Sequence, residues 1–265
     1  MSYTQSIVLG LVQGLTEFLP VSSSGHLILV PLVFGWPDQG LAFDAVTHLG
    51  TLAALLAYFR GELRALLAGT LSRRLALMIL VATIPTLLGG FLFETWIENV
   101  RLPLVIAATT GGWAIVMWAA DCRAGNVARR DGEPLERVAW SQGIAVGCAQ
   151  ALALIPGTSR SGITITTGLL SGLDRATAAR YAFLLSIPIT AVVGGHKMRQ
   201  LLHQGMSPGE GGPLLVAVFV AFASGLFAVW FLVNYLRTRS LLPFVIYRLV
   251  LASVILVTIA FGAHR

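Results

Sequence analysis

Six stretches of the chain are apolar over a length that suits a bilayer, and they limit the fold more than any other feature. They cover residues 43–58, 75–93, 102–120, 178–194, 214–236 and 241–261. A helix of about 20 apolar residues crosses the hydrocarbon core of a membrane. Charged residues make up only 11% of the chain, whereas a soluble domain carries about 25%. We therefore predict an all-α polytopic membrane protein with one integral membrane domain over residues 1–265, and we exclude a disordered chain, a disulfide scaffold and a nucleic-acid-binding module.

Two further apolar regions, 5–34 and 138–173, differ from these six because each is interrupted in its middle. The first is interrupted by Pro20-Val21-Ser22-Ser23-Ser24-Gly25, and the second by Pro156-Gly157-Thr158-Ser159-Arg160-Ser161-Gly162. Each half holds about 10 to 15 residues, too few to cross a bilayer alone. Non-helical backbone at membrane depth is tolerated only inside protein or beside a cavity. We therefore expect two re-entrant helix pairs beside about six transmembrane helices.

The two interrupted regions also resemble each other in sequence. An offset of 137 residues aligns them without a gap. The identical pairs include Gln5/Gln142, Gly10/Gly147, Gln13/Gln150, Ser22/Ser159, Ser24/Ser161, Gly25/Gly162, Leu32/Leu169 and Gly35/Gly172. Two membrane segments can share composition, but glycines and serines that match at the break favour an internal repeat. We predict repeat motifs over residues 5–35 and 142–172.

The arginines between the apolar runs predict the orientation of the chain. The formal net charge is +6, and the arginines fall in three short loops at Arg60, Arg64, Arg73 and Arg74, at Arg123, Arg129, Arg130 and Arg137, and at Arg237 and Arg239. Basic loops stay on the cytoplasmic side. All three loops can lie inside if the first interrupted segment dips from outside and the second from inside, which is an inverted-topology repeat. Both termini are then outside, and Lys197 and Arg199 are exceptions to the rule.

The first interrupted segment carries an acid and a histidine at the break. Gln13 and Glu17 are four residues apart and share a helix face. A carboxylate at membrane depth is costly and normally has a partner or a function, although a Glu at the membrane surface can also reach water. Ser22, Ser23 and Ser24 precede His26, which can act as a base, a nucleophile or a metal ligand, or can simply bond the backbone.

The second break combines hydroxyls with an arginine. Ser159, Arg160 and Ser161 follow the proline, and Thr164 lies one turn later. A helix that starts at such a break presents free N–H groups and the positive end of its dipole, which suits an anion. The guanidinium fork of arginine matches phosphate oxygens. Any one of these serines can be a simple helix cap, but the two breaks together predict a site that binds a diphosphate.

These residues carry a resemblance to a known family. Gln13-Gly14-Leu15-Thr16-Glu17-Phe18-Leu19-Pro20-Val21-Ser22-Ser23-Ser24-Gly25-His26 resembles the first signature of the undecaprenyl-diphosphate phosphatases, the bacitracin-resistance integral membrane phosphatases. The run from Pro156 to Thr164 is similar to their second signature, P-G-x-S-R-S-x-x-T. The resemblance continues through Phe43-Asp44 and His48-Leu49-Gly50 to Pro243-Phe244 and Tyr247-Arg248.

The resemblance implies hydrolysis of a prenyl diphosphate lipid, undecaprenyl diphosphate, in the bacterial cell membrane, with a divalent metal such as Mg²⁺ or Ca²⁺. Carried over by position, Glu17, Ser23, His26 and Arg160 would be catalytic, and Ser22, Ser24, Ser159, Ser161 and Thr164 would bind the substrate. Glu17 and Gln13 would hold the metal, although a glutamine offers no charge to it. The site is expected to open to the extracytoplasmic side. The nucleophile, the metal, the prenyl length and a homo-oligomeric state stay open.

Two other functions fit parts of the pattern. Broken helices in an inverted repeat also describe a secondary transporter or a lipid flippase, for which Ser23 and His26 would be incidental. Ser24-Gly25-His26 and Ser159-Arg160 echo the phosphatidic-acid phosphatases. Those enzymes also need Lys-x6-Arg-Pro and a His-x3-Asp after the Ser-Arg, and the sequence has neither.

Overall fold

The structure is a computed structural model that describes residues 1–37, 40–69, 72–100, 102–125, 134–204, 209 and 211–262. The described residues form helices and no strand. The α-helices are α1 (Tyr3–Phe18), α2 (Ser23–Phe34), α3 (Gly40–Tyr58), α4 (Arg60–Leu67), α5 (Arg73–Leu92), α6 (Glu94–Asn99), α7 (Pro103–Gly125), α8 (Trp140–Ala151), α9 (Arg160–Leu170), α10 (Arg175–Gln204), α11 (Gly211–Tyr235) and α12 (Leu242–Gly262). Two 3₁₀ turns, Leu135–Arg137 and Leu152–Leu154, precede and follow α8.

Five helices among the described residues are long and apolar enough to cross a membrane, namely α5, α7, α10, α11 and α12. The sixth predicted span, 43–58, lies within α3, whose 19 residues include the shorter apolar stretch Val46–Tyr58. This composition and these lengths confirm the prediction of an all-α polytopic membrane protein. Helix α10 has 30 residues and exceeds the predicted range 178–194, because its polar ends continue the helix beyond the apolar segment.

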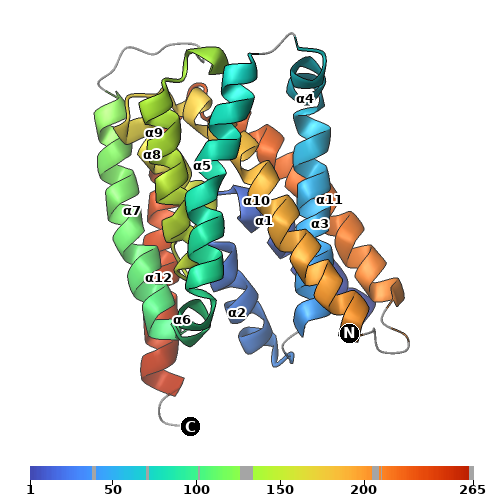
Figure 1. The fold of residues 1–265 in the computed structure, drawn as a ribbon. Coiled ribbons are helices and arrows are strands. Elements are labelled where there is room, and N and C mark those ends of the chain that lie inside the picture. The colour runs from blue at the N-terminus through green and yellow to red at the C-terminus, as the bar shows by residue number, and fades with distance from the viewer. Residues whose placement is uncertain are drawn as a thin grey trace.

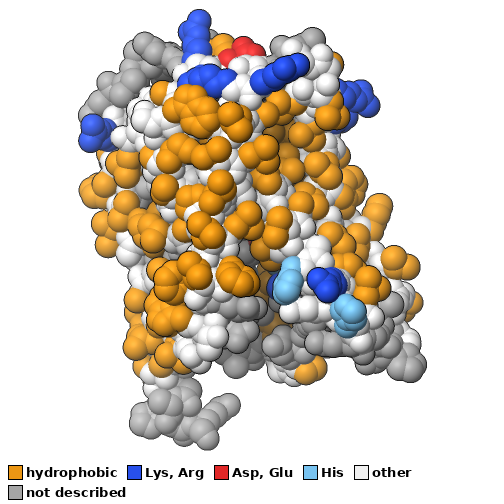
Figure 2. Space-filling view, in the orientation of Figure 1, with side chains coloured by type: hydrophobic (Ala, Val, Ile, Leu, Met, Phe, Trp, Pro, Cys, Tyr) orange, Lys and Arg blue, Asp and Glu red, His pale blue; other side chains and the backbone are white. Residues whose placement is uncertain are grey.

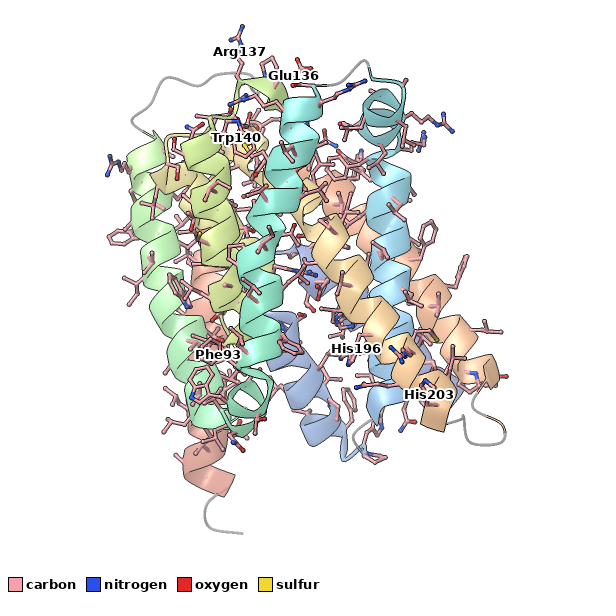
Figure 3. All side chains as sticks on the ribbon, viewed as in Figure 1. Phe93, Glu136, Arg137, Trp140, His196 and His203 are labelled. Carbon is pink, nitrogen blue, oxygen red and sulfur yellow. The ribbon has the colours of Figure 1, made fainter. Side chains whose placement is uncertain are left out.

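The basic loops lie together at one end of the molecule. Figure 1 shows α4 at the upper end and the N-terminus and the end of α12 at the lower end, and Lys and Arg side chains gather at the upper end in Figure 2. Arg74 joins two of the loops because its guanidinium donates to the carbonyls of Glu136 and Val138, each at 3.0 Å. His196 and His203 of α10 lie toward the lower end (Figure 3). Arg129 and Arg130 fall outside the described residues.

The interrupted segments form α1 with α2 and α8 with α9, and their first helices start at opposite ends. Helix α1 begins beside the N-terminus at the lower end (Figure 1), whereas Trp140, the first residue of α8, lies near the upper end (Figure 3). Helix α1 packs along α11, and α8 packs along α5. Gly10 and Gly147 permit these close approaches, since a Cβ at either position would press on the carbonyl oxygen of Ala217 or Ala82.

The backbone of the two breaks is matched at the predicted offset. Ser22 has a φ of 73° and Ser159 a φ of 68°, and they are the only described non-glycine residues in the left-handed region. Gly35 and Gly172, which follow the second helices, also have positive φ values of 65° and 89°. Such strain at a serine costs about 1–3 kcal/mol and concentrates at functional sites. The full inverted repeat and its re-entrant relation to a membrane stay predictions.

Candidate active site

An ion pair between Glu17 and Arg160 lies at the meeting point of the two breaks. Glu17 is near the end of α1 and Arg160 is the first residue of α9, so the contact joins residues 143 positions apart. The guanidinium Nη2 donates to Glu17 Oε1, with side-chain exposures of 17% for Arg160 and 8% for Glu17. Removing either partner would leave a largely buried charge without compensation, which is strongly destabilising.

Neutral donors complete the environment of the Glu17 carboxylate. Its Oε2 accepts from Ser23 Oγ at 3.0 Å and from Gln13 Nε2 at 3.1 Å. Arg160 is held from its other side, because its Nη1 donates to Thr190 Oγ1 of α10 at 2.8 Å. The structure therefore brings together four of the predicted site residues, Gln13, Glu17, Ser23 and Arg160. Thr190 was not predicted, since one threonine in an apolar span carries no sequence signal.

Two serines at equivalent positions of the repeats connect the breaks. Ser24 Oγ accepts from the backbone N–H of Gly157 at 3.2 Å. Ser161 Oγ donates to the carbonyl of Leu19 at 3.1 Å. Ser24 and Ser161 are separated by the predicted offset, and so are Leu19 and Pro156, the neighbour of Gly157. Each break thus uses the same serine to reach the other, which fixes the distance between Glu17 and Arg160.

Three more of the predicted residues bond within their own breaks, Ser159 and Thr164 in the second and Ser22 in the first. Ser159 caps α9, because its hydroxyl accepts from the N–H of Gly162 at 3.2 Å. Thr164 is fully buried, and its hydroxyl donates to the carbonyl of Arg160 at 2.7 Å. Ser22 is also fully buried, and its hydroxyl lies 3.3 Å from that of Ser24.

Arg248 supports the second break from behind. Its side chain is fully buried, and its guanidinium donates to the carbonyls of Thr110, Gly157 and Thr158 at 3.1 Å. The hydroxyls of Thr109 and Thr110 donate to the carbonyls of Pro156 and Gly157. These bonds draw the carbonyls toward α7 and α12 and place a positive charge beside the first turn of α9. Sequence placed Arg248 in the last span but did not connect it to this break.

His26 is directed toward α12. One ring nitrogen, Nδ1, lies 2.7 Å from the carbonyl of Ser22. The other, Nε2, lies 2.6 Å from the hydroxyl of Tyr247.

The two breaks are not chemically equivalent, although their backbones match. At the predicted offset Glu17 corresponds to Leu154, Ser23 to Arg160, and His26 to Ile163. The first break therefore supplies the acid and the histidine, and the second supplies the cation. A single charged centre results from two similar segments.

Gln13 has an oxygen that suits a divalent cation. Its side chain is 1% exposed, and its Oε1 has no hydrogen-bond partner among the described residues. Amide and carboxylate oxygens are hard ligands of the kind that Mg²⁺ and Ca²⁺ take, with phosphate oxygens completing the coordination. No group of three or more His, Cys, Asp or Glu side chains in the described part of the chain could hold a metal. By the chemistry of their oxygens, Gln13 and Glu17 fit a divalent cation.

The helices and the site define the class of protein. It is a multi-pass membrane protein with a carboxylate, a guanidinium and hydroxyls between two broken helical segments. The chain belongs to the family described as bacitracin resistance protein BacA, whose family model matches residues 6–254.

Curated relatives are similar over nearly the whole chain. Undecaprenyl-diphosphatase 2 of Stutzerimonas stutzeri (strain A1501) is 46% identical over 270 residues, which cover 97% of this chain and 98% of the relative. The undecaprenyl-diphosphatase of Myxococcus xanthus (strain DK1622) is 44% identical, with coverage of 99% and 91%. That of Moorella thermoacetica (strain ATCC 39073 / JCM 9320) is 46% identical, with coverage of 96% and 97%.

Proposed function

We propose that this protein hydrolyses undecaprenyl diphosphate to undecaprenyl phosphate and inorganic phosphate, and so recycles the lipid carrier of cell-wall synthesis. The observation that carries the proposal is the Glu17–Arg160 pair between the two breaks, in a chain of the BacA family whose relatives are named undecaprenyl-diphosphatase. A bacterial inner-membrane location follows from the same lipid substrate.

Arg160 is the group that grips the diphosphate. Its Nη1 and Nη2 now bond Thr190 and Glu17, and the planar fork can exchange these partners for two phosphate oxygens. The first turn of α9 adds backbone N–H groups and the positive end of a helix dipole. Arg248 adds a second buried positive charge behind this turn. Together they stabilise the charge that develops on the transferred phosphoryl group.

Ser23 is the hydroxyl best placed to attack phosphorus. Its proton already points at Glu17 Oε2, so the carboxylate can take that proton as the oxygen forms a bond to the terminal phosphorus. The bond from that phosphorus to the bridging oxygen breaks, and undecaprenyl phosphate leaves. Water then releases phosphate from the serine, and the proton on Glu17 returns to Ser23 Oγ.

A divalent cation is the third element of the proposal. The Glu17–Arg160 pair is neutral by itself, so the two or more negative charges of a diphosphate need further compensation at low dielectric. Gln13 Oε1 and the Glu17 carboxylate would hold the cation. When bound, it would neutralise phosphate oxygens and polarise the phosphoryl group.

The site is proposed to face the extracytoplasmic side. Helix α1 begins, and helix α2 finishes, on the side of the molecule opposite the arginine loops (Figures 1 and 2). The basic loops mark the cytoplasmic end. A lipid substrate would then reach Glu17 from the outer leaflet.

The test is phosphate release from undecaprenyl diphosphate by the purified protein in detergent, with Mg²⁺ or Ca²⁺ and with a chelator. We expect one phosphate for each undecaprenyl phosphate formed, and loss of activity with the chelator. The alternative function is that of a lipid flippase. In proteoliposomes, such a protein would move the diphosphate lipid between leaflets without any phosphate release. That second result would reject hydrolysis.

A further inference from the structure

His26 has no ring nitrogen left for a substrate in the structure. Nδ1 lies 2.7 Å from the carbonyl of Ser22, and Nε2 lies 2.6 Å from the hydroxyl of Tyr247. The ring itself is 8% exposed. Any role of His26 in proton transfer therefore involves Tyr247, which comes from α12 and is 221 residues away in sequence.

The two contacts determine which nitrogen is basic. A carbonyl oxygen only accepts, so Nδ1 must carry a proton and donate to Ser22. In the neutral ring Nε2 then has the lone pair, and the phenol of Tyr247 donates to it. If Nε2 gains a proton, the same phenol oxygen accepts from it without any movement. Tyr247 thus suits both protonation states of His26.

The geometry of the pair restrains the ring as well as the proton. The two rings are nearly parallel, with an interplanar angle of 8° and centroids 5.5 Å apart. Tyr247 is 46% exposed, whereas His26 is buried. Tyr247 is therefore the more exposed residue of the pair.

We propose that Tyr247 is the positioning residue of His26. It keeps the basic lone pair on Nε2 and holds the ring against α12. In the second step of the proposed hydrolysis, the water that attacks the phosphoserine gives up a proton: the Tyr247 hydroxyl takes this proton as its own passes to Nε2, and the imidazolium later returns the proton to the released phosphate. The inference rests on the proposed phosphatase activity for its effect on rate, but the contact itself can be tested without any substrate. If Tyr247 instead blocked His26 from taking part in the reaction, its removal would raise kcat.

The kinetic test compares Tyr247→Phe with the wild type in the phosphate-release assay. This variant removes one oxygen from a partly exposed ring, and we expect kcat to fall about tenfold, because a hydrogen bond to a charged group is lost. KM should stay within about twofold, since the hydrogen bond of Tyr247 is to His26 and not to Arg160, the residue proposed to grip the diphosphate. Tyr235→Phe is the matched control, because its hydroxyl has no hydrogen bond to a described residue, and it should keep the wild-type kcat. An unchanged or raised kcat in Tyr247→Phe would overturn the proposal.

A double variant tests whether Tyr247 acts through His26. In a His26→Ala background, Tyr247→Phe should cause no further loss of kcat, because residues that act as a unit are not additive. A second loss of about tenfold in that background would mean that Tyr247 acts independently, contrary to the proposal.

Nuclear magnetic resonance of protein labelled with ¹⁵N-histidine provides a readout without turnover. The chain has five histidines, and the His26 signals are those missing from His26→Ala. We expect Nδ1 of His26 to be protonated and Nε2 to be a hydrogen-bonded acceptor. In Tyr247→Phe only the Nε2 resonance should move, toward that of a free lone pair. An unmoved Nε2 resonance would refute the contact. Absence of phosphate release by the wild type would reject the phosphatase activity, and the resonance would still decide the positioning of His26.

Discussion

The buried pair of Glu17 and Arg160 should be energetically coupled, and a double-mutant cycle measures this coupling. Glu17→Gln leaves the guanidinium with neutral acceptors only, among them the hydroxyl of Thr190, and Arg160→Met leaves the carboxylate with the neutral donors of Ser23 and Gln13. Loss of one partner of a buried pair costs about 3–5 kcal/mol, whereas replacement of both can be nearly neutral. We expect about 3 kcal/mol for each single variant and a double variant that is about 2–3 kcal/mol more stable than their sum.

The surface pair of Glu62 and Arg180 is the matched control for this cycle. Its atoms are 3.1 Å apart, but its side chains are 26% and 29% exposed. Exposed pairs contribute about 0–1 kcal/mol, so Glu62→Gln and Arg180→Met should be nearly additive. The assay is reversible unfolding in mixed micelles, followed by tryptophan fluorescence. Additive losses at Glu17 and Arg160, like those of the surface pair, would refute the buried pair.

Three further predictions concern the breaks, the metal and the topology. Gly157→Ala should destabilise the protein by about 2–4 kcal/mol in the same assay, because φ is +87° and a Cβ would overlap Thr109; a stability equal to wild type would contradict the geometry of this break. In a metal titration of phosphate release, Glu17→Gln should be inactive, and Gln13→Glu should be active at a lower metal concentration than the wild type. If Glu17→Gln shows the metal dependence of the wild type, Glu17 is not a metal ligand. In whole cells, an impermeant maleimide should label a cysteine at Ser2 but not Cys122, and labelling of Cys122 would reverse the orientation.

Much of the fold could be predicted because membrane helices follow from local composition. The apolar ranges 75–93 and 214–236 became α5 (Arg73–Leu92) and α11 (Gly211–Tyr235) within three residues at each end. Proline and serine runs at Pro20 and Pro156 marked where the helices end, since proline cannot continue a helix and serine favours its start. Helices α4 and α6 were missed, because they are short and lie outside the apolar runs.

The arrangement of the site could be predicted only in part. The residue types at the two breaks and their common offset of 137 residues predicted that both breaks contribute to the site. It did not pair Glu17 with Arg160, because a contact over 143 residues depends on how α1 and α9 meet. Tyr247 and Thr190 were absent from the predicted site for the same reason, because each reaches it from a distant helix. The Tyr247-Arg248 pair was noted as part of the resemblance, but nothing local connects it to His26.

The central claim is that the two breaks form one hydrolytic site, and Arg160→Lys tests it most directly. Lysine keeps the charge but cannot bond two phosphate oxygens with one planar fork. In the phosphate-release assay with undecaprenyl diphosphate, we predict that the wild type is active and that Arg160→Lys is at least about tenfold slower, a loss of about 1.4 kcal/mol or more in transition-state stabilisation. Near-normal turnover in Arg160→Lys would show that Arg160 is structural and would contradict the account.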